Sequence, residues 1–216
     1  MTTTYCMKTL VIYGAGGLGR EILDIVQSRP DGHAEILFAD DGLDPGTVVA
    51  GRRVIGGFDH LCEMSRGATS VVIGVGKPAI RAQIWQRLGD AGFLPATVID
   101  PTAVVRPSAT VKPGAVIGAN VFVSCGAVVH ENAVIGTGAM VAHDAEIGPH
   151  SAVRPLAIVN GTAWVGEAAE IGAGASVMPG RRVADHAIVA MGAAAFVDVG
   201  PNVTVIGNPA RILSRG

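Results

Sequence analysis

Residues 111–153 read VKPGAVIGANVFVSCGAVVHENAVIGTGAMVAHDAEIGPHSAV, and every sixth residue, counted from Val111, is valine or isoleucine. The spacing continues in both directions, from Ile99 to Val189, and all sixteen positions carry Val or Ile. Four residues after each of them stands a second column, in which thirteen of the sixteen residues are alanine. Neither an amphipathic helix nor an alternating strand has a period of six. The repeat therefore predicts a different architecture.

A parallel β-helix of triangular cross-section has this period. Each unit of six residues forms one short flat side and a corner, and three units complete a coil of about 18 residues. Coils stack ~4.8 Å apart, and β-branched side chains suit such a stacked interior. We interpret both columns as core, with alanine near the corners, where little volume is available. Five glycines directly follow aliphatic residues, and we expect their backbone freedom to help the chain turn. They are Gly118, Gly136, Gly148, Gly166 and Gly172.

The residues that precede the repeats have a pattern typical of a small α/β domain. The segment KTLVIYGAGGLGREILDIV, residues 8–26, predicts a strand, a glycine-rich turn and a helix. Further strands are expected over residues 35–39 and 70–75, and a helix over residues 79–91. Alternating strands and helices predict a parallel sheet with helices on its faces. We therefore expect a Rossmann-like domain over residues 1–98 and a β-helix domain over residues 99–216.

The glycine-rich turn is a candidate phosphate site. Gly14, Gly16 and Gly19 satisfy the pattern GxGxxG, in which backbone N–H groups at a helix N-terminus can bind phosphate. The next predicted strand ends at Asp40 and Asp41, whose carboxylates could accept hydrogen bonds from a ribose or a base. A complete dinucleotide fold needs two such halves, so a nucleotide half-site is favoured over an NAD site. Two alternatives stay open: glycines that serve only helix–strand packing, and aspartates in a solvated turn.

Composition excludes several classes of partner. The formal charge is -2, from 16 basic and 18 acidic residues, and no run of like charge suggests nucleic acid or an anionic membrane as partner. Cys6, Cys62 and Cys125 are odd in number and form no CxxC pair, which fits a reducing cytosol. The N-terminus does not resemble a signal peptide. The charge-free stretch 113–130 is broken by Gly, Asn, Ser and Pro, so we reject a membrane span and expect a cytoplasmic protein.

The two halves, in this order, resemble the family of nucleotide-sugar N-acetyltransferases and sialic acid O-acetyltransferases. The motifs that carry the resemblance are YGAGGLGREILD, FADD, VVIGVGKPAIR, VIDPTAVV, VAHDAEIG and VIGNPARIL. Members combine a small Rossmann-like domain with a left-handed hexapeptide β-helix. The resemblance implies acetyl-CoA as co-substrate, a homotrimer and a role in surface glycan biosynthesis.

The family's catalytic histidine lies in a V-x-H-[DE] segment, which here is residues 141–144. The resemblance implies that His143 is the general base and Asp144 its orienting carboxylate. An amine or hydroxyl that attacks a thioester must lose a proton, and imidazole can accept it near neutral pH, for roughly 10²–10⁴-fold in rate. His143 stands two residues past an inward valine, so we expect it near a corner and facing outward. The alternative is a surface histidine without a role.

Further contacts follow from the resemblance alone. Gly161 matches a glycine whose backbone contacts the cofactor, and residues 190–192 match a second contact region less closely. Ala152 stands where several members carry a histidine that contacts acetyl-CoA, and whether His150 substitutes for it is left open. The implied cofactor contacts are Gly161, Ala152, Ala190, Met191 and Gly192. The implied substrate contacts are Gly14, Ala15, Gly16, Asp40, Asp41 and Gly76.

Two other chemistries are considered and rejected. A zinc site needs three clustered ligands; His150 and His186 are two coils apart, ~10 Å along the axis, and no third histidine completes a site, so no metal is expected. Cys125, one coil before His143, is expected to pack rather than to act as a nucleophile. Direct attack on the thioester is therefore the simpler reaction.

The sequence thus predicts acetyl transfer from acetyl-CoA to the amino group of a UDP- or GDP-linked 4-amino-deoxysugar. We expect the nucleotide on the first domain, the sugar extending towards His143, and pantetheine along the coils between neighbouring subunits. O-acetylation of a sialic acid is the alternative within the same family. A non-catalytic β-helix scaffold with a nucleotide-sensing domain is the alternative from another class.

Overall fold

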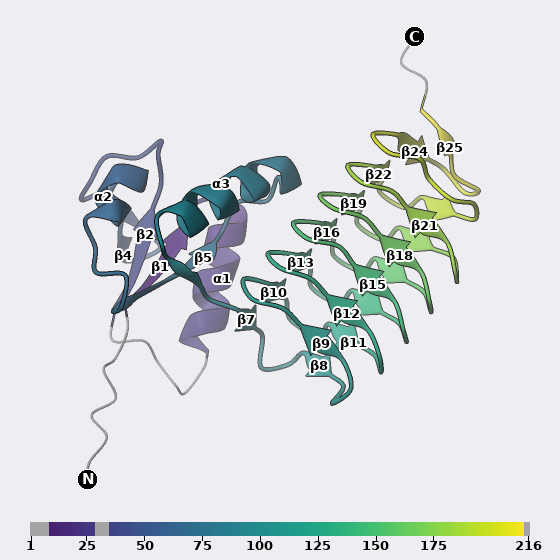
Figure 1. Ribbon diagram of the computed structural model, residues 1–216, viewed down its shortest axis with the longest axis horizontal. Coiled ribbons are helices and arrows are strands. Elements are labelled where there is room, and N and C mark those ends of the chain that lie inside the picture. The colour runs from purple at the N-terminus through teal and green to yellow at the C-terminus, as the bar shows by residue number, and fades with distance from the viewer. Residues whose placement is uncertain (1–8, 29–34, 214–216) are drawn as a thin grey trace. The chain divides into compact units, whose positions relative to one another are not determined.

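The computed structural model describes residues 9–28 and 35–213, and the chain divides into two compact units, Met1–Val98 and Ile99–Gly216. The first unit is built on a parallel sheet of four strands in the order β2-β1-β5-β6 (Figure 1). These strands are β1 (Thr9–Tyr13), β2 (Glu35–Ala39), β5 (Thr69–Ile73) and β6 (Leu94–Pro95). The other elements are α1 (Gly17–Gln27), α2 (Phe58–Cys62), α3 (Pro78–Asp90), β3 (Val48–Val49) and β4 (Arg52–Arg53).

The central strand of this sheet is covered on both faces. Leu10 and Val11 are adjacent in β1 and point to opposite faces, and both are fully buried. Val11 belongs to a core cluster with residues of α2 and α3, whereas Phe38 of β2 lies against Gly19 of α1. The predicted strands and the helix near 79–91 are confirmed within two residues. Strand β6, helix α2 and the hairpin β3–β4 are elements that the sequence analysis did not identify.

The second unit is a solenoid of two- and three-residue strands that form three sheets (Figure 1). The first sheet holds β7 (Val98–Ile99), β10 (Val116–Ile117), β13 (Val134–Ile135), β16 (Ala152–Val153), β19 (Glu170–Ile171), β22 (Ile188–Val189), β24 (Thr204–Ile206) and β25 (Arg211–Ile212). The second holds β8 (Val104–Val105), β11 (Phe122–Val123), β14 (Met140–Val141), β17 (Ile158–Val159), β20 (Ser176–Val177) and β23 (Ala194–Ala195). The third holds β9 (Thr110–Val111), β12 (Val128–Val129), β15 (Glu146–Ile147), β18 (Trp164–Val165) and β21 (Arg182–Val183).

The register of these strands confirms the predicted coil. Phe122 pairs with Met140 and Met140 with Ile158, in parallel, so that each strand lies beside the one 18 residues further on. The column of Val and Ile residues is fully buried from Ile117 to Val189. Residues of the same column before Ile117 are only partly buried, because they belong to the terminal coil, which has a β-helix neighbour on one side only. At the other end, β25 pairs antiparallel with β24.

The corners of the β-helix are made by a third column, which the sequence analysis did not identify. Three residues after each Val or Ile from Val111 to Val189, the backbone has a positive φ, at fourteen corners in succession. The corner residues are Gly114, Asn120, Gly126, Asn132, Gly138, Asp144, His150, Leu156, Thr162, Ala168, Gly174, Gly180, His186 and Gly192. Glycine adopts this conformation without strain, and Asn, Asp and His adopt it more readily than other residues.

The predicted role of the five glycines that follow aliphatic residues is wrong. None of them has a positive φ, so they do not make the turns. A Cβ added at any of the five would instead meet backbone atoms of the following coil at 2.5 to 3.0 Å. These glycines are therefore needed for the close stacking of coils, because no side chain fits between them.

Replacing Gly172 by alanine is expected to lower the free energy of unfolding by about 1–3 kcal/mol. The added Cβ would lie 2.5 Å from the backbone nitrogen of Met191. Gly200 is a matched control in the same unit, because a Cβ there would meet only Val203 Cγ2, at 3.8 Å. Urea denaturation followed by circular dichroism measures both variants, and equal stability of Gly172→Ala and Gly200→Ala would contradict the stacking role.

Candidate functional site

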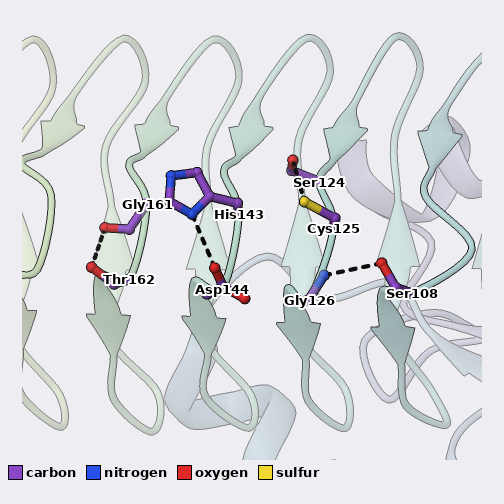
Figure 2. A network of polar contacts seen from close by, with 8 residues as sticks. All are labelled: Ser108, Ser124, Cys125, Gly126, His143, Asp144, Gly161 and Thr162. Atoms are coloured by element: carbon purple, nitrogen blue, oxygen red, sulfur yellow. Dashed lines mark hydrogen bonds and ion pairs between the residues drawn. The ribbon is translucent and has the colours of Figure 1, made fainter.

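His143 and Asp144 lie at the corner that follows β14, and equivalent corners of the neighbouring coils lie on either side of them (Figure 2). The backbone links this column from coil to coil. The N–H of Asp144 donates to the carbonyl of Cys125 (3.0 Å), and the N–H of Thr162 donates to the carbonyl of His143 (2.9 Å). The corner is therefore held by its neighbours on both sides, and its side chains project from a fixed backbone. This confirms the predicted placement of His143 at a corner.

The two side chains form an exposed pair. His143 Nδ1 lies 3.0 Å from Asp144 Oδ2, and the side chains are 60% and 63% exposed. A carboxylate at this distance favours the tautomer that carries the proton on Nδ1. Nε2 then holds a lone pair and can accept a proton from a bound molecule. The arrangement suits a general base that is open to solvent and substrate.

Two glycines, one on each neighbouring coil, leave room for this pair. A Cβ on Gly161 would collide with the imidazole of His143, with Nε2 as the nearest ring atom and Cε1 at 2.6 Å. A Cβ on Gly126 would collide with the carboxylate of Asp144. Figure 2 shows the imidazole on the side of Gly161 and the carboxylate below it. The absence of side chains at these two positions allows the pair its observed geometry.

Cys125 lies one coil before His143, as expected, but it does not pack into the core. It is a free and exposed thiol, so the prediction of a packing role is wrong. Its sulfur accepts a long hydrogen bond of 3.9 Å from the hydroxyl of Ser124 (Figure 2). Cys62 is also a free thiol, and Cys6 lies outside the described residues.

The other residues expected to contact the cofactor are not brought together with His143. Ala152 is fully buried in β16, and its contact with the cofactor stays a prediction. Residues 190–192 follow β22 and so form a corner of the first sheet, whereas His143 follows a strand of the second. Met191 is highly exposed there, and Gly192 is the corner residue. Within one chain, only Gly161 of the predicted cofactor residues adjoins His143.

The remaining histidines of the β-helix have structural partners or structural positions. His150 Nδ1 lies 2.9 Å from Nδ2 of the buried Asn132, and His130 Nε2 lies 2.8 Å from Oε1 of Glu146. His150 and His186 are both corner residues with positive φ. Among the described residues, no group of three His, Cys, Asp or Glu side chains is close enough to hold a metal ion.

In the first unit, the predicted substrate residues gather at the carboxyl edge of the sheet. Residues 14–16 follow β1, residues 40–41 follow β2, and Gly76 lies in the loop after β5. Gly14 has a φ of 107°, and a Cβ on Gly19 would collide with the carbonyl of Gly14. These two glycines therefore serve the backbone turn and helix–strand packing, which was the alternative to phosphate binding. Gly16 is different, because it is exposed and a Cβ there would meet no atom within 4 Å.

Asp40 is tied to the glycine-rich turn. Its Oδ2 accepts a hydrogen bond from the N–H of Ala15 (2.8 Å), and its Oδ1 accepts one from the N–H of Gly42 (2.9 Å). The N–H of Ala15 thus has a partner inside the protein. A carboxylate at this position also repels a phosphate. The substrate contacts of Ala15 and Gly16 stay predictions.

Asp41 has different partners from Asp40, namely Tyr13, Phe58 and Arg87. Its carboxylate accepts hydrogen bonds from the Tyr13 hydroxyl (2.6 Å) and the Phe58 N–H (2.9 Å), and it lies 3.6 Å from Arg87. Burial acts to raise the pKa of Asp41, but these hydrogen bonds and the charge of Arg87 outweigh it, so the pKa lies below the ordinary 3.8. Burial, with Asp41 alongside, raises the pKa of Tyr13, which stays a donor. Arg87 also stacks on the ring of Phe58, at 4.0 Å.

Known proteins match this chain in both of its units. Residues 9–88 match the family described as the PglD N-terminal domain. The acetyltransferase domain of PglB from Neisseria gonorrhoeae, in complex with acetyl coenzyme A, is 32% identical over 95% of this chain and 99% of that one, with a TM-score of 0.90. The chain belongs to this family of hexapeptide-repeat acetyltransferases.

Two further structures resemble this acetyltransferase. A histidine variant of perosamine N-acetyltransferase from Caulobacter crescentus, in complex with CoA and GDP-perosamine, is 28% identical over 97% of this chain and 98% of that one, with a TM-score of 0.91. WeeI from Acinetobacter baumannii is 26% identical over 95% of this chain and 100% of that one, with a TM-score of 0.89. A comparison with curated proteins gave no match.

These findings confirm the predicted fold class and enzyme class. The acetyltransferase has a small Rossmann-like α/β domain followed by a left-handed parallel β-helix. In the part of the chain that the structure describes, no helix is long and apolar enough to span a membrane. A cytoplasmic location stays a prediction.

Replacing Tyr13 by phenylalanine is expected to lower the free energy of unfolding by about 1 kcal/mol at pH 7, because a hydrogen bond to an ionised and half-exposed carboxylate is lost. The folded pKa of Asp41 is depressed, so this stabilisation is present above the ordinary value of 3.8 and is lost as the pH falls through the folded pKa. Thermal unfolding of both proteins between pH 7 and pH 3 measures the difference. A difference in stability between the wild type and Tyr13→Phe that grows towards pH 3 would contradict the charge-assisted hydrogen bond.

Proposed function

We propose that this acetyltransferase moves the acetyl group of acetyl-CoA to the amino group of a nucleotide-linked amino sugar, with His143 as general base. The observation that carries the proposal is the exposed His143–Asp144 pair beside Gly161. The perosamine N-acetyltransferase, of similar fold and 28% identical, is described with CoA and GDP-perosamine, and the PglB domain with acetyl coenzyme A. These ligands support acetyl-CoA as donor and a nucleotide-linked amino sugar as acceptor. We propose that the nucleotide is UDP or GDP and that the product serves surface glycan biosynthesis.

The reaction requires one proton transfer at the base. The amine attacks the carbonyl carbon of the thioester and forms a C–N bond, while His143 Nε2 accepts the proton that the amine loses. Asp144 accepts the hydrogen bond of Nδ1–H and stabilises the imidazolium that forms. Collapse of the intermediate breaks the C–S bond, and the proton passes to the leaving thiolate of CoA. A Cβ on Gly161 would lie nearest to Nε2, so the absence of a side chain there leaves the reacting nitrogen accessible.

The first unit is proposed to bind the nucleotide. The gathering of Gly16, Asp40 and Gly76 at the carboxyl edge of the sheet supports this role. Ligands of open α/β sheets bind at this edge. Asp40 and Asp41 already accept internal hydrogen bonds, so we propose that they shape the turn and add at most a second hydrogen bond to a ribose or a base.

We also propose that the protein is a homotrimer in which neighbouring subunits share the cofactor. Val104, Phe122, Met140 and Ile158 pair in register on the outward side of the second sheet, and Val104 and Ile158 are 46% and 37% exposed. A continuous apolar stripe of this kind is typical of a surface that another chain covers. A partner copy would then bring its own residues 190–192 to the cofactor beside His143.

Replacing His143 by alanine is expected to lower kcat for CoA release by roughly 10²–10⁴-fold, because the proton acceptor is lost. The KM values for both substrates should change little, because the base acts mainly in the transition state. A thiol reagent follows CoA release with a panel of UDP- and GDP-linked 4-amino sugars. His186→Asn serves as control, since it changes a corner histidine that is two coils or more from the pair.

Full turnover by His143→Ala would rule out the assigned base. Activity on free sialic acid, with none on any nucleotide-linked amino sugar, would instead favour O-acetylation and would overturn the proposed acceptor.

Replacing Gly161 by alanine is expected to lower kcat by about 100-fold, because the added Cβ displaces the imidazole by an ångström or more. The backbone of residue 161 remains, so any backbone contact with the cofactor is retained. The KM for acetyl-CoA should therefore equal that of the wild type. Gly200→Ala is the matched control. A raised KM for acetyl-CoA with kcat unchanged would show that Gly161 serves the cofactor and not the base.

A further inference from the structure

Arg81 is the largest fully buried side chain among the described residues. Burying a guanidinium group is unfavourable unless its N–H groups find partners. Arg81 also lies in the first turn of α3, where the helix dipole disfavours a positive charge. Proteins keep such unfavourable features mainly at functional sites, where the function requires them. The contacts of Arg81 indicate what that requirement is.

The guanidinium reaches back across the start of its own helix to the loop after β5. Nη1 donates to the carbonyl oxygens of Gly76 (3.0 Å) and Val75 (3.3 Å). A peptide unit is planar and trans, so its N–H points away from its carbonyl oxygen. Because the carbonyl of Gly76 points to Arg81, the N–H of Lys77 points away from it. Arg81 thus sets the orientation of two successive peptide units in this loop.

The loop occupies a special place in the sheet. The sheet order is β2-β1-β5-β6, so the chain passes from β1 to one neighbour and later returns to the other side of β1. The strand order therefore reverses between β1 and β5, and open α/β sheets bind ligands in the crevice at this point. A Cβ on Gly14 would meet Val75 Cγ2 at 2.8 Å and the carbonyl of Gly74 at 3.1 Å. The loop held by Arg81 therefore borders the glycine-rich turn at the crevice.

We propose that Arg81 is a positioning residue for the nucleotide part of the substrate. It acts through residues 75–77, whose backbone it orients from the interior, and it does not touch the substrate. The inference rests on the proposed function, because it needs a nucleotide at the carboxyl edge of the first unit. It assigns a role to a residue that lies inside the protein and that neither the motif GxGxxG nor the His143–Asp144 pair includes.

Steady-state kinetics of three full-length variants tests the proposal. Arg81→Met keeps the length of the side chain and removes the hydrogen bonds, and Arg81→Lys keeps the charge and one donor group. Ile84→Ala is the control, because Ile84 is a buried residue of the same helix whose side chain has no hydrogen-bonding group. Thermal unfolding of all three shows how much stability each variant loses. Calorimetry with UDP and GDP measures nucleotide binding without turnover.

Arg81→Met is expected to raise the KM for the nucleotide sugar and the Kd for its nucleotide by ~10- to 100-fold, the effect of losing hydrogen bonds to a charged group. The kcat and the KM for acetyl-CoA should remain those of the wild type. Arg81→Lys should recover part of the loss, and Ile84→Ala should lower the melting temperature with the KM unchanged. A KM for the nucleotide sugar that rises in Arg81→Met but not in Ile84→Ala distinguishes positioning of the nucleotide from a general loss of stability.

Two results would overturn the inference. One is an Arg81→Met enzyme that binds nucleotide as tightly as the wild type. The other is a KM for the nucleotide sugar that rises equally in Arg81→Met and Ile84→Ala. Failure of the proposed function is distinguishable: the wild type would then bind UDP or GDP but transfer no acetyl group to any linked amino sugar, and the Kd values would still decide the role of Arg81. A wild type that binds neither nucleotide overturns both.

Discussion

The stacking of identical coils is the constraint on which the rest of the β-helix depends. Each strand pairs with the one 18 residues later, so every inward side chain must fit between two others in the same column. This requirement fixes the corner backbone as well, because at every corner from Asn132 to Gly192 the N–H of the corner residue donates to a carbonyl of the preceding coil, as Asp144 does to Cys125. A side chain at a corner is consequently presented from a rigid frame, which is what a catalytic group needs.

The sequence could predict this frame because the signal is periodic. Sixteen Val and Ile residues at a spacing of six leave few alternatives, and the corner position of His143 follows from counting. The column with positive φ could not be predicted, because its members range from glycine to Leu156 and Ala168 and share no side-chain chemistry. The five stacking glycines were identified, but for the wrong reason. Lack of space and freedom to turn both select glycine, and only the structure distinguishes the two causes.

The first unit was less predictable, for a physical reason. Its strands and helices have clear patterns, but its site is made by loops whose polar groups bind one another across long sequence separations. Asp40 closes the glycine-rich turn through Ala15, and Asp41 joins Tyr13 to Phe58. No spacing rule encodes such pairs. Neither does any pattern show that Arg81, in the first turn of a helix that otherwise looks amphipathic, is buried against two carbonyl oxygens.

Asp144 joins the structural constraint to the proposed chemistry. The corner requires a left-handed backbone, with a φ of 56° here, which costs most residues about 1–2 kcal/mol and costs glycine almost nothing. Aspartate is among the residues that tolerate this conformation, since its short polar side chain can form local hydrogen bonds. The same backbone turn brings its carboxylate back to Nδ1 of the preceding residue, His143. A glycine would relieve the strain and lose the carboxylate, whereas aspartate at this corner both turns the coil and orients the imidazole.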